Sequence, residues 1–588
     1  MARIAFDLES DGFLDGVTQI WTICTQDIDT GEVRGFGPEE IDDGIDYLMT
    51  ATELIGANII SYDIPVIRKL HPRFNIDNIK VTDTLVLSRL IHADLRNEDF
   101  IKGYTAEQLP KRLHGSHSLK AWGLRLGNRK DDFGETTDWS AWSQEMQDYC
   151  HQDVALTVAL YKHLEPHKWS QESIRLEHSL AEVCHRIGRA GWTFDTDKAI
   201  KLYAALAQER DDLQQELAAL FPPWTIEEEF IPKANNSRYG YVKGEPFVKR
   251  KEVHFNPQSR KHIEFCLRQK YRWKPKEFTP SGDAKIDETV LNQLPYPEAK
   301  KLAHSFMLQK RIGQLAEGNN AWLKLQDNGV LRHVINPNGT VTGRASHFNP
   351  NLAQVPATRA AYGKQCRELF TVPPGYVLVG SDLSGLELRC LAGYLQDGGA
   401  YAKEVIEGDI HTANMAAFGV ADREQSKRCA YALLYGAGNA KLGEVVGGTA
   451  ADGKRLRDNF LRNTPAFASL LRAVKSAVDK KGYLIGLDGR RLAIRSEHAA
   501  LNTLLQSAGA LICKKWVQLV DEELRKSGLD AAVVGWIHDE LQAKVKRGFE
   551  NDVCDIARRS AKAAGEYFQF GVPIEADATV GTDWSVTH

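Results

Sequence analysis

Residues 376–389 read YVLVGSDLSGLELR, and this stretch decides how the rest of the sequence is interpreted. The apolar, β-branched run at 376–379 predicts a buried strand, and Ser384-Gly385 ends it before a helix begins. Asp382 is therefore expected at the end of a strand. A carboxylate held at such a rigid position suits a hard divalent cation, which prefers oxygen ligands. Taken alone, however, such an aspartate is more often a helix cap than a metal ligand.

The overall composition is that of an ordinary globular protein. The 588 residues are 43% hydrophobic and 26% charged, and a chain of this length is expected to form about four domains. No apolar run approaches the roughly 18 residues that span a bilayer, and the sequence opens with the strand-like RIAFDLE instead of a secretion signal. We therefore expect no membrane association and a cytoplasmic location.

The cysteine content and the net charge exclude few classes of protein. The nine cysteines are scattered without any CxxC spacing, which predicts reduced thiols with neither a disulfide framework nor a zinc site. The net charge of −4 does not indicate a nucleic-acid-binding protein. It does not exclude nucleic-acid binding either. A basic groove attracts nucleic acid through its local field, and the carboxylates that an enzyme uses to bind metals make its net charge more negative.

A second group of candidate residues lies in the first part of the chain. It comprises Asp7, Glu9, Asp63, Tyr149 and Asp153. The first two share one face of a predicted strand, and the last two lie one helical turn apart. Acids on separated elements, with a tyrosine able to orient a water, are what metal-assisted phosphodiester hydrolysis requires, with two ions clamping the attacking and leaving oxygens.

The middle of the chain is less informative. From about residue 173 the pattern is helical, which is typical of a plain spacer. Residues 221–254 then combine Pro, Gly, Asn and aromatic residues with several lysines and arginines. A solvated loop has this composition, and so does a loop that contacts a nucleic-acid backbone, so both interpretations stay open.

The most informative helix is predicted at residues 423–435. One stripe along it carries Arg423, Lys427, Tyr431 and Tyr435, each four residues after the last. Like charges at this spacing repel mildly unless an anion faces them, and a triphosphate is such an anion. An aromatic ring beyond the cations would contact the base. The alternative is an amphipathic helix with a basic edge.

Other candidate DNA contacts and a second source of carboxylates follow the same logic. Arg344 ends a turn-rich segment whose small residues allow close approach to a phosphate backbone. Gln506 lies in a predicted buried helix, where an amide needs a partner such as a base edge.

His538, Asp539 and Glu540 separate two predicted strands. Three ionisable residues at the tip of an apolar hairpin are unusual, because a turn selected for stability prefers Asn-Gly or Asp-Gly.

Together these motifs resemble a known family. DLSGLELR, the R-x3-K-x3-Y helix that ends in YGAG, and HDE resemble the three polymerase motifs of the family A, or Pol I-like, DNA polymerases. The order D-x-E, N-x4-D and Y-x3-D resembles the proofreading 3′–5′ exonucleases. VTGRASH, NLAQVP and GDIHT are most similar to the replicative polymerases of the phage T-seven type. The resemblance implies a ribonuclease-H-like α/β exonuclease domain joined to an α+β right hand of palm, fingers and thumb.

The resemblance also implies domain boundaries. They are residues 1–172 for the exonuclease, 173–325 for the thumb with a short basic insertion at 221–254, 326–400 and 486–588 for the two parts of the palm, and 401–485 for the fingers.

Roles for individual residues follow from the same resemblance. Metal ligands, for two Mg²⁺ ions in each active site, would be Asp382, the carbonyl of Leu383 and Asp539 in the polymerase, with Glu540 close by, and Asp7, Glu9 and Asp153 in the exonuclease. The triphosphate would be bound by Arg423, Lys427 and His411. Tyr431 would lie against the incoming nucleotide, Tyr435 would support the templating pocket, and Glu387 would fill the space that a ribose 2′-hydroxyl needs. Primer and template would contact Arg344, Gln506 and His538.

Primer-template DNA and dNTPs are the expected partners, in a phage protein that works in the cytoplasm of a bacterial host. A replicative helicase-primase is a candidate partner. The insertion that recruits thioredoxin as a processivity factor in the phage T-seven type is clearly shorter here, at residues 221–254, which argues against thioredoxin binding.

Three alternatives remain to be weighed. A single-subunit RNA polymerase shares the palm and the basic helix, but Glu387 and the exonuclease motifs argue against it. A repair nuclease with an inert polymerase half would lose only the second activity. A non-catalytic accessory subunit is disfavoured because every metal-binding acid of the family pattern is present.

Overall fold

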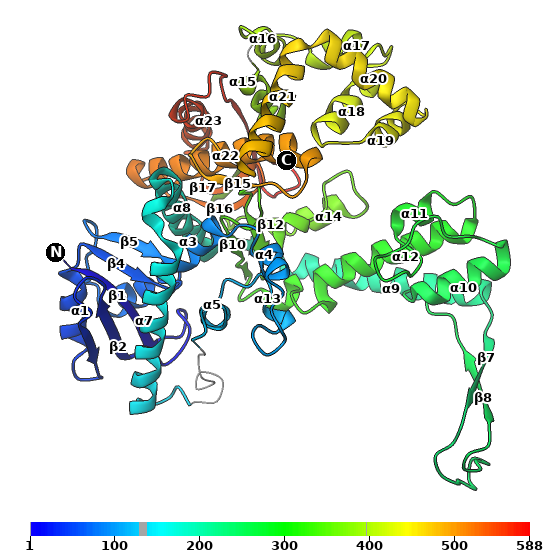
Figure 1. Ribbon diagram of the computed structural model, residues 1–588, viewed down its shortest axis with the longest axis horizontal. Coiled ribbons are helices and arrows are strands. Elements are labelled where there is room, and N and C mark those ends of the chain that lie inside the picture. The colour runs from blue at the N-terminus through cyan, green and yellow to red at the C-terminus, as the bar shows by residue number, and fades with distance from the viewer. Residues whose placement is uncertain (1, 129–137, 396) are drawn as a thin grey trace. The chain divides into compact units, whose positions relative to one another are not determined.

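The computed structural model describes residues 2–128, 138–395 and 397–588 (Figure 1). The chain forms two compact units. The first comprises Met1–Trp192, Arg332–Gln354 and Val372–His588, and the second comprises Thr193–Leu331 and Val355–Thr371. Among the described residues, no helix is both long enough and apolar enough to cross a membrane.

The N-terminal part of the first unit is built on a five-stranded sheet with the order β3-β2-β1-β4-β5. The strands are β1 Arg3–Ser10, β2 Ile20–Asp27, β3 Val33–Phe36, β4 Glu53–Gly56 and β5 Lys80–Asp83. β2 runs antiparallel to β1 and β3, whereas β4 runs parallel to β1 and β5. A mixed sheet of this kind agrees with the α/β exonuclease domain predicted from the sequence.

Helices cover both faces of this sheet. They are α1 Ile41–Met49, α2 Asp63–Leu70, α3 Thr84–Ile91, α4 Leu95–Lys102, α5 Leu119–Leu126 and α7 Gln144–Leu164. Because side chains alternate along β1, Ile4 and Phe6 pack into a core with α1 and α2, while Ala5 packs into a second core with α3 and α7. Asp7 and Glu9 alternate in phase with Ala5, so they belong to the α7 side of the sheet.

A four-stranded antiparallel sheet, β16-β17-β13-β18, lies at the base of the C-terminal part of the same unit. Its strands are β13 Tyr376–Leu383, β16 Ala531–Ile537, β17 Glu540–Lys546 and β18 Ala576–Gly581. Gly385 takes a positive φ of 58° immediately before α15 Leu386–Tyr394. Glycine adopts that conformation without strain, and the break predicted at Ser384-Gly385 is confirmed.

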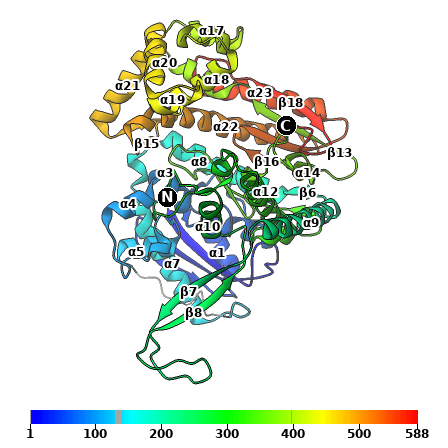
Figure 2. The same cartoon turned by 90° about the vertical axis from the view of Figure 1, so that its right-hand side faces the viewer.

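Two long helices pack on this sheet, α22 Ala500–Ser527 and α23 Glu550–Tyr567 (Figure 2). The buried helix predicted around Gln506 is confirmed as α22. The segment between α15 and α22 is almost entirely helical, with α16 Ala400–Ile406, α17 Ile410–Phe418, α18 Arg423–Leu434, α19 Asn439–Val445, α20 Ala450–Asn463 and α21 Pro465–Lys481, followed by the short hairpin β14 Tyr483–Ile485 and β15 Arg491–Ala493. The predicted helix at 423–435 is confirmed as α18, with Tyr435 at its C-cap.

A buried ionic network links helix α8 (Gln171–Ala190) to the C-terminal part of the first unit. Glu177 on α8 forms ion pairs with Lys514 on α22 and, at 2.6 Å, with Arg490 in the β14–β15 turn, and Arg490 also pairs with Asp488 at 2.7 Å. None of these four side chains is more than 3% exposed. Removing one member would leave buried charge without its partner, which is strongly destabilising.

The second unit is mainly helical. It contains α9 Thr196–Leu220, α10 Arg260–Tyr271, α11 Glu288–Asn292, α12 Pro297–Ile312, α13 Trp322–Leu325 and α14 Gly363–Arg367. A small sheet, in the order β12-β6-β9, is formed by Phe370–Thr371, Trp192–Phe194 and Val330–Leu331. The predicted thumb range of 173–325 remains a prediction, and its first helix, α8, lies in the first unit.

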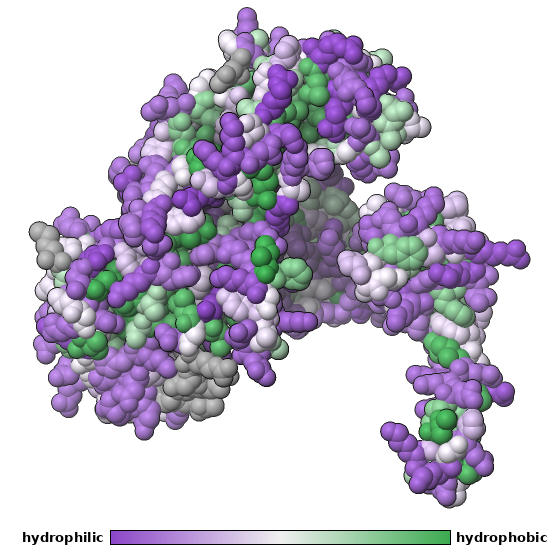
Figure 3. Space-filling model, viewed as in Figure 1, coloured by the Kyte–Doolittle hydropathy of each residue, from purple (hydrophilic) through white to green (hydrophobic). Residues whose placement is uncertain are grey.

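Residues 221–254, expected as a loop, instead contain an antiparallel hairpin that projects from the helices of the second unit (Figure 1). Its strands are β7 Trp224–Phe230 and β8 Phe247–Val253. The acidic run on β7 faces the basic run on β8, with Glu227 paired to Arg250 at 2.8 Å. Cross-strand pairing of opposite charges stabilises this two-stranded ribbon. Its surface is hydrophilic with scattered hydrophobic patches (Figure 3).

Candidate active sites

Strand pairing brings the polymerase carboxylates together. In the register of β13 and β17, Asp382 lies opposite Glu540. The N–H of Leu383 donates to the carbonyl oxygen of Asp539 at 3.0 Å. The two aspartates are more than 150 positions apart in the sequence, yet the sheet fixes them as neighbours at one end.

The electrostatics of this group suit a cation. Partial desolvation, followed by the negative charges of Asp539 and Asp577, raises the pKa of Asp382. Asp577 lies opposite Asp382 on β18, and the sequence analysis did not identify it. Carboxylates that disfavour one another's ionisation in this way are stabilised by a bound divalent ion, so the donor set fits the predicted metal site.

Glu540 occupies a different environment from its neighbour Asp539. It begins β17 instead of lying at the hairpin tip, and only 4% of it is exposed. Its carboxylate accepts hydrogen bonds from Trp584 Nε1 at 2.5 Å and Gln542 Nε2 at 2.7 Å, and His588 Nδ1 lies 2.8 Å from its other oxygen. The C-terminal segment, through Trp584 and His588, therefore holds the Glu540 carboxylate in place like a clamp.

The sequence contains one signal for this clamp. Gly380 lies in the middle of β13, where glycine normally weakens a strand. A Cβ at this position would come within 2.3 Å of the carbonyl oxygen of Thr587. The glycine therefore marks close approach of the C-terminal segment to the strand that carries Asp382.

The predicted sugar-selecting residue, Glu387, lies at the start of α15. The hydroxyl of Tyr435 donates to its carboxylate at 2.5 Å, and Arg344 Nη2 lies 3.5 Å from the same oxygen. A cavity of about 210 Å³ includes Arg344, Glu387, His538 and Asp539 in its lining. The structure thus brings together residues that the sequence analysis assigned separately to the nucleotide, the primer and the metal.

The remaining predicted nucleotide contacts lie on α17 and α18. His411 and Tyr431 have ring centroids 6.1 Å apart, and those of Tyr431 and Tyr435 are 6.4 Å apart. Arg423 is held by Asp409, at 2.7 Å, and lowers the pKa of that carboxyl. Asp409 also caps α17 through the N–H groups of residues 411 and 412. The basic end of the stripe is therefore paired with an acid in this structure.

The structure says less about the roles of two predicted site residues, Lys427 and Gln506. Lys427 is half-buried on α18. Gln506, on α22, is also half-buried, instead of fully buried as its helix suggested. It lies one helical turn before Ala510, which lines the cavity, and is not itself among the described lining residues.

A second carboxylate group lies in the N-terminal part of the first unit. Oxygens of Asp7 and Glu9 and the sulfur of Cys150 all lie within 4.8 Å of one another. Tyr149 and Asp153 occupy the same helix, α7, as predicted. Cys150 was not predicted as a site residue, because its distance in the sequence from Asp7 gives no indication of contact.

Asp63 belongs to the same group. It is buried, and its Oδ1 accepts the N–H of Leu8, between the two acids of β1, at 3.2 Å. Burial and the charges of Asp83 and Asp153 raise its pKa to about 7. As at the other site, crowded carboxylates in a desolvated position fit a divalent cation.

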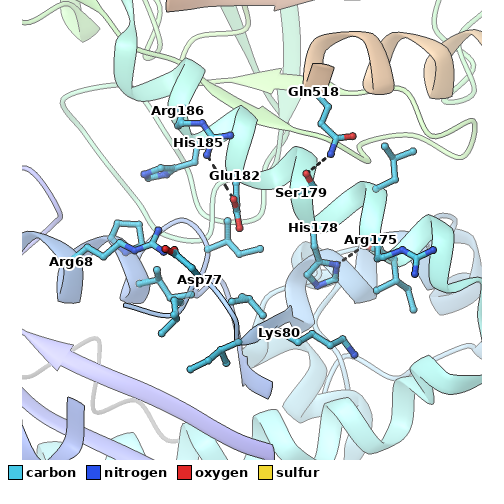
Figure 4. A pocket seen from close by; sticks show the side chains of 18 of the residues that line it. Arg68, Asp77, Lys80, Arg175, His178, Ser179, Glu182, His185, Arg186 and Gln518 are labelled. Carbon is cyan, nitrogen blue, oxygen red and sulfur yellow. Dashed lines mark hydrogen bonds and ion pairs between the residues drawn. The ribbon is translucent and has the colours of Figure 1, made fainter. Parts of the chain in front are cut away.

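A cavity of about 960 Å³ adjoins α2 and α8 (Figure 4). Of the described residues that line it, none is a predicted site residue. Several of its polar side chains are used within the fold: His178 accepts the N–H of Asp83, and Gln518 donates to Ser179. We assign no function to this cavity.

Comparisons with known proteins identify the family of the chain. A model of DNA polymerase family A matches residues 242–586. The DNA-directed DNA polymerase of Enterobacteria phage T3 is 35% identical over 99% of both chains, and that of Escherichia phage T7 is 34% identical over 100% of both. The solved POL domain of Pol1 from M. smegmatis, in complex with DNA primer-template and dNTP, has a TM-score of 0.74 at 18% identity, covering 99% of this chain and 95% of that one. The last match concerns the fold alone. The chain belongs to DNA polymerase family A, together with the polymerases of phages T3 and T7.

Proposed function

We propose that this family A DNA-directed DNA polymerase adds deoxynucleotides to a primer at Asp382 and Asp539 and removes them at a separate 3′–5′ exonuclease site. The observation that carries the first part is the β13–β17 register, which sets Asp382 beside Asp539 and Glu540. Glu387 and Arg344 line the same cavity as Asp539. A template-directed enzyme needs this combination of metal ligands, a sugar-selecting residue and a primer contact.

Asp382 and Asp539, with the carbonyl of Leu383, would hold two Mg²⁺ ions. Such ions, when bound, lower the pKa of the primer 3′-hydroxyl and stabilise the charge that develops on the leaving pyrophosphate. Glu540, held by Trp584 and Gln542, fixes the start of β17 and so orients Asp539. Its role is to position the ligand beside it.

The fingers residues would bind the incoming nucleotide. Arg423, Lys427 and His411 would contact the triphosphate, and Tyr431 and Tyr435 would contact the sugar, base and templating pocket. Burial and the charges of Arg423 and Lys427 lower the pKa of His411, whereas the negative charge of a bound triphosphate would raise it. A bound triphosphate would compete with Asp409 for Arg423, because both are anions. Arg344, Gln506 and His538 would contact primer and template.

The exonuclease site would use Asp7, Glu9, Asp63 and Asp153 as its acids. The first, second and last would hold two Mg²⁺ ions, and Tyr149 would orient the attacking water. Support comes from the grouping of Asp7 and Glu9 and from the electrostatic coupling of Asp63 to Asp153. The two phage relatives suggest that the enzyme works in the cytoplasm of an infected bacterium, where a helicase-primase would be its partner.

Separate substitutions at the two sites test this assignment. With primer-template and dNTPs, Asp382→Asn should abolish synthesis and leave degradation of the primer end intact. The pair Asp7→Ala and Glu9→Ala should abolish degradation and leave synthesis intact. If either variant, shown to be folded by circular dichroism, lost both activities, the two-site assignment would be wrong. Degradation that persisted in the double variant would rule out the exonuclease assignment alone.

A further inference from the structure

A thiol lies beside the carboxylates of the proposed exonuclease site. Cys150 lies on α7 and is fully buried. Its Sγ is 3.4 Å from the backbone oxygen of Asp7 and 3.9 Å from Asp7 Oδ2. The thiol therefore borders the two β1 acids directly, in a position where an oxygen or nitrogen ligand would serve Mg²⁺ better.

The spacing of these atoms is close to that of a mixed sulfur and oxygen metal site. In a tetrahedral zinc site, Zn–S of about 2.3 Å and Zn–O of about 2.0–2.2 Å place the sulfur and oxygen about 3.5–3.7 Å apart. The observed separation of 3.9 Å exceeds this by a few tenths of an ångström. Oxygens of Asp7 and Glu9 and the Cys150 sulfur lie within 4.8 Å of one another, so small side-chain movements would complete three ligands.

Resting on the exonuclease function proposed above, we propose that Cys150 is a further ligand of this metal site and makes it selective for thiophilic divalent cations such as Zn²⁺. On binding, the sulfur donates a lone pair to the ion and the thiol proton leaves to solvent. Carboxylates alone suit Mg²⁺, whereas a thiolate favours Zn²⁺. The predicted polymerase ligands are all oxygen atoms, so Zn²⁺ at low concentration would occupy the exonuclease site preferentially and slow degradation more than synthesis.

The first experiment measures binding without activity. Co²⁺ is titrated into the full-length protein in the absence of DNA, and sulfur-to-cobalt charge-transfer absorption is recorded in the near ultraviolet. The wild type should show this band, and both Cys150→Ser and Asp7→Ala should lose it. Cys554→Ser, which removes a buried thiol on α23, should retain it. A band that survives in Cys150→Ser, or that is absent in the wild type, would overturn the proposal.

The second experiment measures selectivity. Exonuclease and polymerase rates are recorded in Mg²⁺ with increasing Zn²⁺, and each rate is divided by that variant's own rate in Mg²⁺ alone. Cys150→Ser should need about 10- to 100-fold more Zn²⁺ for half inhibition of the exonuclease, with no change in the Zn²⁺ sensitivity of the polymerase. Equal sensitivity of both variants would refute selectivity through Cys150.

The two experiments separate this inference from the function on which it rests. A wild-type protein that binds Co²⁺ through Cys150 but degrades no DNA in Mg²⁺ would refute the exonuclease function and leave the metal site. A protein that degrades DNA but gives no sulfur-dependent band would refute the role of Cys150 and leave the exonuclease. Thermal unfolding of each variant identifies any that fails to fold.

Discussion

The hydroxyl of Tyr435, at the C-cap of α18, donates a hydrogen bond to the Glu387 carboxylate on α15 at 2.5 Å. The contact joins α18 to the first turn of the helix that follows the strand of Asp382. Arg344 approaches the same carboxylate oxygen at 3.5 Å. Glu387 is thus held from two sides beside the polymerase cavity, which is the position required of a residue that excludes a 2′-hydroxyl by its bulk.

Glu387→Ala should therefore weaken discrimination against ribonucleotides. Removing the side chain opens space for a 2′-hydroxyl, and the ratio of kcat/KM for dCTP to that for CTP should fall by about 10- to 100-fold. Single-nucleotide incorporation measures this ratio. Tyr435→Phe is the matched control, because it removes the hydrogen bond and keeps Glu387. If Glu387→Ala left the ratio unchanged, Glu387 would not be the sugar-selecting residue.

Trp584→Phe should reduce the polymerase rate specifically. It deletes the indole N–H that binds Glu540, while a phenyl ring preserves part of the stacking on Trp192, whose ring centroid lies 5.1 Å away. Loss of a residue that orients a metal-site acid costs about 10- to 100-fold. We expect this loss in kcat, with little change in KM for dNTP and no change in exonuclease rate. A parallel fall in both activities would indicate a folding defect instead.

Glu177→Ala should destabilise the first unit. It would leave Lys514 and Arg490 buried without their shared partner, at a cost of about 3–5 kcal/mol in the free energy of unfolding. Urea unfolding followed by tryptophan fluorescence measures the change. Glu182→Ala on the same helix is the control: its partner Arg186 is 3.7 Å away and its side chain is 52% exposed, so the loss should be below about 0.5 kcal/mol. Similar losses in both variants would contradict the importance of the network.

Mild acid should destabilise the protein through two buried histidines. Burial lowers the pKa of His333 to about 3 and that of His347 to about 4. Between these values and about 6.5, the unfolded chain binds protons that the folded protein does not. The contribution of each histidine to the free energy of unfolding should therefore fall as pH drops below about 6.5, by about 1.4 kcal/mol per pH unit, until its folded pKa is reached. The raised pKa of Asp63 acts in the opposite sense over this range, so the histidine contribution is read from the difference between variants.

Unfolding midpoints from pH 7 down to about pH 5 test this dependence. His333→Phe should make the slope smaller, whereas His167→Gln, at an exposed position, should leave it unchanged. An unaltered slope in His333→Phe would show that this ring is not held neutral by the fold.

The β7–β8 hairpin allows a defined shortening. Phe230 and Phe247 are cross-strand partners, so residues 231–246 can be replaced by Asn-Gly, the preferred two-residue turn, without altering the register. If the hairpin contacts the DNA backbone, the shortened enzyme should make fewer additions per binding event, and adding thioredoxin should change neither protein. Unchanged processivity would support a solvated element, and stimulation by thioredoxin would contradict the inference from the short insertion.

A variant that changes only the charge of the hairpin tests its electrostatic contribution to DNA binding separately from its length. Replacing Lys233, Arg238 and Lys243 by alanine keeps the full length. The slope of log affinity for primer-template against log salt should become shallower by about 0.9 for each phosphate contact that is lost. An unchanged slope would exclude these cations as phosphate contacts.

The local elements that carry the candidate polymerase site could be predicted because their motifs are local. The apolar strand followed by Ser384-Gly385, and the four-residue spacing of the α18 stripe, are properties of short segments. Backbone conformation and helical periodicity determine them directly. The hairpin at 221–254 was missed because its strands pair charged residues, with Glu227 opposite Arg250, and lack the apolar alternation by which strands are recognised.

The sequence by itself determined which residue types are available and the local elements that carry them, including Asp382 at a strand end and Tyr149 one turn from Asp153. Only the tertiary structure decided that Glu540 is clamped by the C-terminal segment, that Asp577 joins the polymerase acids, and that Cys150 borders Asp7. The physical reason is that sheet register and helix packing bring together atoms far apart in the chain. The order of residues along the chain does not show which distant residues will lie close together.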